Sequence, residues 1–67
     1  MDTALSTRTG LAQVNCNKAW LARKLKVTPQ YIGAVCNGKT KPSTEMIEKL
    51  ANAFEVEVSV YIKWGEL

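Results

Sequence analysis

The sequence contains no histidine and only two cysteines, Cys16 and Cys36. Because a zinc site needs four well-spaced ligands, this set excludes one, and we predict two reduced thiols and no bound metal. No apolar run approaches the ~20 residues that cross a bilayer. Met1 is not followed by the pattern of a signal peptide. We therefore expect a cytoplasmic protein without a membrane segment.

The sequence also lacks the residues from which active sites are built. It has no paired-carboxylate motif and no glycine-rich phosphate loop in addition to the missing histidine. No catalytic constellation can be assembled from what remains. We predict that the protein is not an enzyme, has no cofactor and takes no evident small-molecule ligand.

Acidic residues are scarce in the first two thirds of the chain. Residues 1–41 carry seven basic side chains against Asp2, whereas residues 42–67 carry two lysines against five glutamates. The net charge of +3 hides this asymmetry. A basic half favours a surface that faces a polyanion, although a chance skew of surface charge would give the same count.

Sixty-seven residues of ordinary globular composition predict one domain, residues 1–67. Residues 3–15 give a weak helical signal, with Leu5, Leu11, Ala12 and Val14 available to one face. Asn17 is expected to cap a helix that begins at Lys18. Thr28 is expected to cap the next helix, with Pro29 at its first position.

The second of these helices is predicted to end at Asn37-Gly38, and a basic loop follows it. The apolar residues of this region should face one small core; they are Leu21, Ala22, Leu25, Val27, Ile32 and Val35. Ser43 should cap a further helix, with one buried stripe made of Ile47, Leu50, Ala51 and Phe54. Glu45 and Lys49 are spaced as an ion pair on this helix.

The C-terminal segment has two interpretations. Val56, Val58, Val60 and Ile62 alternate with polar or small residues, which favours a strand. Alternatively, Ser59 caps a short helix through Trp64 that Gly65 ends.

One set of residues carries a family resemblance: Leu21-Ala22, Thr28, Ile32, Val35 and the run Asn37-Gly38-Lys39-Thr40-Lys41-Pro42-Ser43. In type and spacing, this set resembles the helix-turn-helix family of phage repressors, Cro proteins and related XRE-type bacterial regulators. The resemblance covers residues 17–64 and implies an all-α, five-helix, lambda-repressor-like domain, with the helix-turn-helix at about residues 18–37. It also favours a helix over a strand for Val58–Trp64. The family favours glycine at the turn position of Lys26, where a left-handed lysine would cost on the order of 1 kcal/mol.

The resemblance implies a transcriptional regulator that binds a palindromic operator in double-stranded DNA as a homodimer. Residues expected to contact bases are Pro29, Gln30, Tyr31 and Ala34. Residues expected to contact the DNA backbone are Lys18, Thr28, Asn37, Lys39, Thr40 and Lys41. Gln30 is the best candidate reader because its amide can pair with adenine N6 and N7. An antitoxin-like or other protein-interaction module with this fold is the alternative.

The C-terminal apolar residues are candidates for a dimer interface, principally Val58, Tyr61 and Trp64, together with Val56 and Ile62. They could instead close the core of one protomer. Two further positions are open. Trp20 is expected to serve core or subunit packing rather than base stacking. Gly33 weakens its helix, and is either tolerated at an exposed site or required for close approach to DNA or a neighbouring helix.

Overall fold

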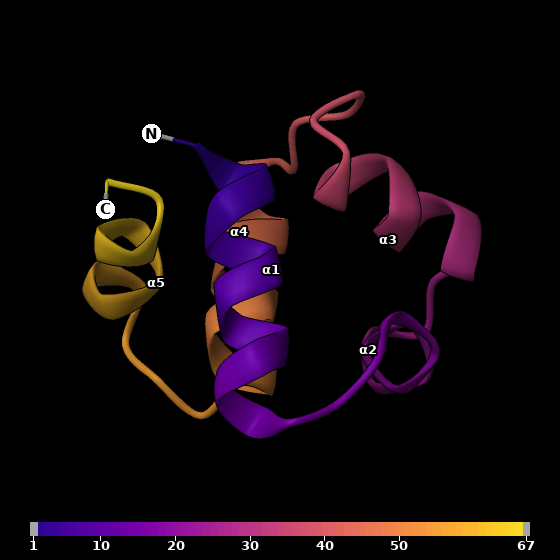
Figure 1. The fold of residues 1–67 in the computed structure, drawn as a ribbon, viewed down its shortest axis with the longest axis horizontal. Helices are drawn as coiled ribbons and strands as arrows, with labels where there is room; N and C mark the ends of the chain where they lie inside the picture. Colours follow the sequence, from indigo (N-terminus) through magenta and orange to yellow (C-terminus); the bar gives the residue numbers. More distant parts are fainter. Residues whose placement is uncertain (1, 67) are drawn as a thin grey trace.

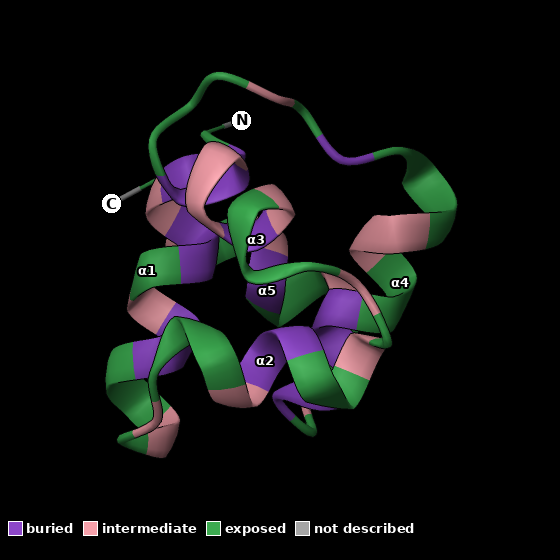
Figure 2. Ribbon diagram, turned by 90° about the vertical axis from the view of Figure 1, so that its right-hand side faces the viewer, coloured by how far each residue is buried: buried purple, intermediate pink, exposed green. Residues whose placement is uncertain are grey.

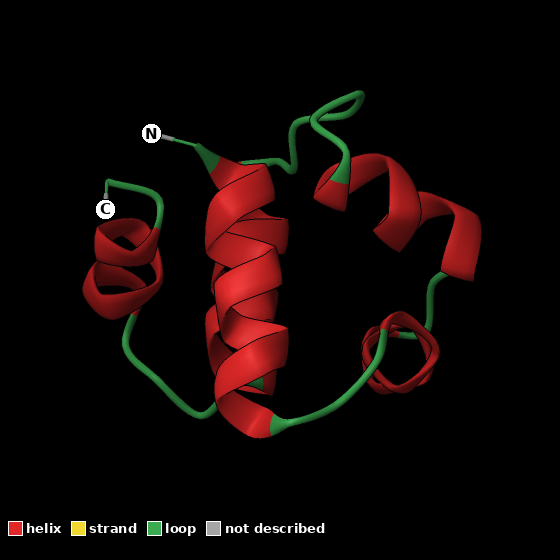
Figure 3. Cartoon of the chain, in the orientation of Figure 1, coloured by secondary structure: helices red, strands yellow, loops and turns green. Residues whose placement is uncertain are grey.

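The computed structural model describes residues 2–66, which contain five helices and no strand (Figure 3). The helices are α1 (Thr3–Val14), α2 (Lys18–Leu25), α3 (Pro29–Cys36), α4 (Thr44–Ala53) and α5 (Val58–Trp64). In Figure 1, α1 lies in front of α4, with α5 on one side and the α2–α3 pair on the other. The predicted all-α, five-helix fold is confirmed.

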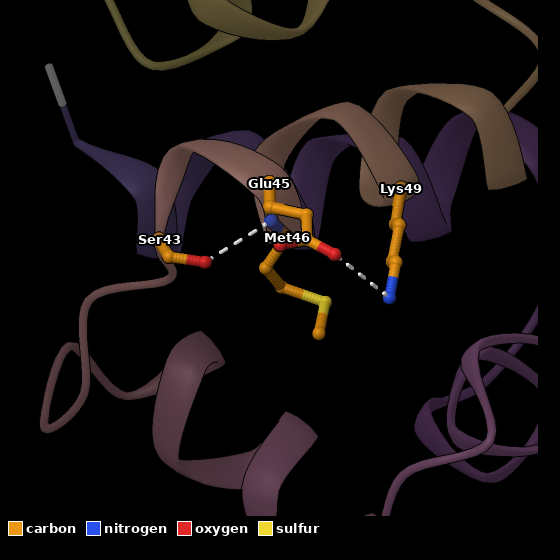
Figure 4. A network of polar contacts seen from close by, with 4 residues as sticks. All are labelled: Ser43, Glu45, Met46 and Lys49. Carbon is orange, nitrogen blue, oxygen red and sulfur yellow. Dashed lines mark hydrogen bonds and ion pairs between the residues drawn. The ribbon is translucent and has the colours of Figure 1, made fainter.

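Short-range hydrogen bonds start four of the helices. Asn17, Thr28 and Ser43 are N-caps as predicted, and each side-chain oxygen accepts from the backbone N–H three residues later, at 2.9, 3.1 and 3.2 Å. Asp2 caps α1 in the same way. Figure 4 shows the Ser43 cap beside the predicted Glu45–Lys49 ion pair, whose charged atoms lie 3.6 Å apart. Both partners are largely exposed, so the pair contributes little to stability.

Residues 58–64 form a helix, so the strand that alternation favours is not formed. In α5, Val58, Tyr61 and Ile62 share one face because they follow helical spacing, and Tyr61 is completely buried. In a strand Val58 and Ile62 would face one way and Tyr61 the other. The suggestion that Ser59 caps this helix is wrong: the N-cap is Glu57, and its side chain makes no capping hydrogen bond.

Helix α1 buries only part of the predicted face: Leu11 is buried and Val14 packs against the core, as predicted. Ala12 is exposed, and the buried residues are Thr3, Ala4, Ser6, Thr7, Gly10 and Leu11. Most of these are small because α1 is approached closely by other elements. A Cβ at Gly10 would lie only 2.6 Å from the ring of Phe54. Hydrophobicity patterns miss such a face, since its small and polar residues carry a weak signal.

The core lies where the helices meet. Its most deeply buried large side chains include Tyr61, Leu21, Ile32 and Leu50. The buried residues of the α2–α3 pair include the predicted Ala22 and Val35, while Leu25 and Val27 are only partly buried and pack at its margin. Both cysteines are free thiols, Cys36 buried and Cys16 partly exposed. No described helix is long and apolar enough to cross a membrane.

The turn between α2 and α3 places an L-residue in a conformation that favours glycine. Lys26 has φ 59° and ψ 43°, which is the left-handed region. Its backbone N–H donates to the carbonyl of Arg23, and the next N–H, of Val27, donates to Ala22. These two hydrogen bonds end α2 within one turn. The left-handed conformation of Lys26 costs about 1 kcal/mol of folding free energy, the amount expected from the sequence.

Candidate nucleic-acid interface

One face of α3 is buried and the opposite face is free. Ile32, Val35 and Cys36 point into the core. Gln30, Ala34 and Asn37 recur at i, i+4 and i+7 and so form a stripe on the other side. Gln30 and Asn37 are exposed and Ala34 is partly exposed. We call Gln30, Ala34 and Asn37 the outer stripe; in Figure 1 its helix lies on the side of α1 that is away from α5.

The first turn of α3 carries three more of the predicted contact residues. Thr28 and Pro29 are exposed, whereas Tyr31 is partly buried and packs against the core. Tyr31 therefore lies at the edge of the outer stripe. Thr28 Oγ1 accepts the Tyr31 N–H at 3.1 Å, and its hydroxyl hydrogen is still available to a phosphate oxygen.

The loop after α3 is fixed to the end of that helix. The backbone N–H groups of Lys39 and Thr40 both donate to the Ala34 carbonyl, at 2.9 and 3.3 Å. Gly38, with φ +76°, makes the turn that allows this. Lys39 and Lys41 are exposed and Thr40 is partly buried. The two lysines are thus held next to the C-terminal end of the outer stripe.

Lys18 is the exposed first residue of α2, a helix that packs against α3. Burial raises the pKa of the Cys36 thiol, and the positive charges of Lys18 and Arg8 act in the opposite direction to a smaller extent. Arg8 is an exposed residue of α1 that the sequence did not indicate as a contact residue. No local pattern could have found it, because its nearness to α3 arises only when α1 packs there.

The predicted dimer residues divide into two groups. Val58 and Trp64 are partly exposed, but Tyr61 has no exposed surface. The Tyr61 hydroxyl lies 3.0 Å from Thr7 Oγ1 and donates to the Thr3 carbonyl at 3.4 Å. The prediction that Tyr61 contacts a second protomer is therefore wrong, because its ring and hydroxyl are used inside the protomer.

Beside these residues, α5 presents Val60, the large hydrophobic residue that is most open to solvent in the described part of the chain. Val60 belonged to both the alternating pattern and the alternative short helix, but not to the predicted dimer residues. The Trp64 ring packs edge-on against the ring of Phe54, with centroids 6.0 Å apart, so part of the Trp64 surface is covered within the protomer. Val58, Val60, Ile62 and Trp64 remain as the accessible apolar surface of α5.

Trp20 and Gly33 were the two open positions. Trp20 is partly buried against the core, as expected, and the Lys24 ammonium lies 5.4 Å from its ring centroid. A Cβ at Gly33 would meet nothing within 4 Å, so no neighbouring helix requires this glycine. Between Asp2 and Glu66, no group of three or more histidine, cysteine or acidic residues could hold a metal ion.

The sequence pattern of the helix-turn-helix family matches residues 8–61, which include all of α2, α3 and α4. No curated protein and no solved structure matches the chain. This family consists of DNA-binding regulatory domains that are in general not enzymes. The outer stripe on α3 and the basic residues beside it agree with that assignment. The chain belongs to the XRE/Cro-like helix-turn-helix family of DNA-binding regulators.

Proposed function

We propose that the protein is a sequence-specific transcriptional regulator of phage repressor or Cro type, acting in the bacterial cytoplasm. It binds a palindromic operator in double-stranded DNA as a homodimer and places α3 in the major groove. The observation that supports this most directly is the outer stripe, because an exposed helix face between basic flanks suits base edges between two phosphate chains.

Within this proposal, Gln30 reads a base. It is exposed in the first turn of α3, so its side-chain amide is open to a partner outside the protein. A bidentate amide pair with adenine contributes about 1–3 kcal/mol of discrimination. Pro29, Tyr31 and Ala34 contact neighbouring base edges, and Thr28, Asn37 and Thr40 contact the backbone together with the lysines.

The test of base reading begins with selection of binding sites from random duplexes, followed by titrations against operators changed at single positions. Gln30→Ala should weaken the best site by about 1–3 kcal/mol and relax the preference at one base pair per half-site. Gln13→Ala is a matched control, because Gln13 is an exposed glutamine on α1. A selection that enriches no sequence would contradict the proposed function. Equal weakening at every sequence would reduce Gln30 to a backbone contact.

The dimer in this proposal forms through the accessible apolar surface of α5, with half-sites ~34 Å apart. Val60→Glu places a charge on this surface without disturbing the core, because Val60 faces solvent. Gln13→Glu changes the net charge equally at an exposed position on α1. Sedimentation with and without operator should show loss of the dimer only for Val60→Glu. A Val60→Glu protein that still binds the palindrome as a cooperative dimer would exclude this interface.

A further inference from the structure

We infer that α1 supplies a third part of the DNA interface, in which Arg8 and Lys18 together bind backbone phosphate at one edge of α3. The inference rests on the proposed function and adds a residue to it. It concerns a contact that contributes affinity and not sequence preference.

The position of Arg8 follows from how α1 packs. Ala4 Cβ lies 3.9 Å from the place that a Cβ of Gly38 would occupy, so the first turn of α1 lies against the loop that follows α3. Arg8 is one turn farther along α1 at i+4, and therefore lies near the same face. Figure 2 shows α1 beside α3 along this edge. Arg8 thus lies next to α3, beyond the loop that carries Lys39 and Lys41.

Arg8 and Lys18 lie on α1 and α2, and both of these helices pack against α3. Arg8 and Lys18 come from different helices, yet both positive charges act on the thiol of Cys36, the last residue of α3. Both side chains are exposed. The ion pair found within residues 2–66 joins Lys49 to Glu45, so neither cation has a carboxylate partner there. Two exposed cations on the helices that flank α3 favour an anion that approaches α3 from this side.

Phosphate is the anion that fits this arrangement. A guanidinium presents a planar fork that binds phosphate oxygens in a bidentate manner. Lys18 adds an ammonium at the first turn of an eight-residue helix, whose free N–H groups also favour phosphate. The lysine loop, Arg8 and Lys18 all lie on segments that contact α3, so they can bind phosphates of the DNA that α3 enters.

The test compares two variants that lose the same charge. Arg8→Gln removes the proposed phosphate contact. Lys24→Gln is the control, because Lys24 lies over Trp20 and beside Lys49 and Ala53, in a hollow at the C-terminal ends of α2 and α4. Both are exposed helix positions where glutamine is a good helix former, so the variants should fold.

The measurement is the dependence of operator affinity on salt concentration, for the operator obtained by selection and for a random duplex of equal length. Arg8→Gln should reduce the slope of log K against log salt by about 0.9 and weaken both duplexes by up to about eightfold at 0.1 M salt. Lys24→Gln should leave the slope unchanged. Arg8→Lys should keep the slope, because it keeps the charge, but lose part of the affinity that the guanidinium fork gives.

The outcomes separate this inference from the proposed function. If the wild-type protein binds neither duplex, the proposed function itself fails. If the wild type binds and Arg8→Gln leaves the slope unchanged, Arg8 is an ordinary solvated charge and only this inference is overturned. An equal fall in slope for Lys24→Gln would also overturn it, since the effect would then come from net charge rather than from a contact.

Discussion

Replacement of Gly33 by alanine should stabilise the protein. Gly33 is in the interior of α3 in a helical conformation, and a Cβ there would meet nothing within 4 Å. Alanine restricts the unfolded chain and favours the helix, which contributes roughly 0.5–1 kcal/mol without any new clash. For a domain of this size, the gain corresponds to an increase in Tm of about 2–8 °C.

Gly10→Ala is the matched control, because it is the same substitution inside another helix. The intrinsic helix gain is the same, but the added Cβ would lie 2.6 to 2.8 Å from three atoms of the buried Phe54 ring. Such overpacking typically costs about 1–3 kcal/mol, so the net effect should be destabilising. Urea and thermal unfolding, followed by circular dichroism, would measure both variants. A Gly33→Ala protein less stable than wild type, or a Gly10→Ala protein more stable, would refute this packing argument.

Two further predictions concern lysines. Lys39→Ala and Lys41→Ala should weaken specific and random DNA alike and lower the salt slope by about one per contact removed; an unchanged slope in both variants would place the loop away from DNA. Lys26→Gly should raise the free energy of unfolding by about 1 kcal/mol, because glycine adopts the observed φ of 59° without strain. Lys24→Gly is the control, because Lys24 lies two residues earlier in regular helix; it should lower the free energy of unfolding by about 1 kcal/mol. Urea unfolding would contradict the argument if Lys24→Gly were the more stable variant.

Lys26 and Gly33 show where local preference and the fold disagree. Each lowers the stability of the helix-turn-helix by an amount that one substitution could recover, and at Gly33 an added Cβ would meet no neighbouring atom. Operator titrations of Lys26→Gly and Gly33→Ala would measure whether DNA binding depends on these residues, separately from their effect on stability.

The sequence by itself determined the features that depend on neighbours along the chain. The caps at Asn17, Thr28 and Ser43 are bonds over three residues, so their residue types predicted the starts of α2, α3 and α4. The buried stripe of α3 also follows from spacing alone, and with it the outward position of Gln30. These predictions succeeded because each depends on one helix and its first turn.

The tertiary structure decided what depends on residues far apart in the sequence. Helix α5 forms instead of a strand because its helical face packs Tyr61 into the core, where the tyrosine hydroxyl meets Thr7 of α1. The same burial removes Tyr61 from the predicted dimer interface. Arg8 became a candidate contact only because α1 packs along α3. Such contacts join residues up to 58 positions apart, and no local periodicity records which helices will meet.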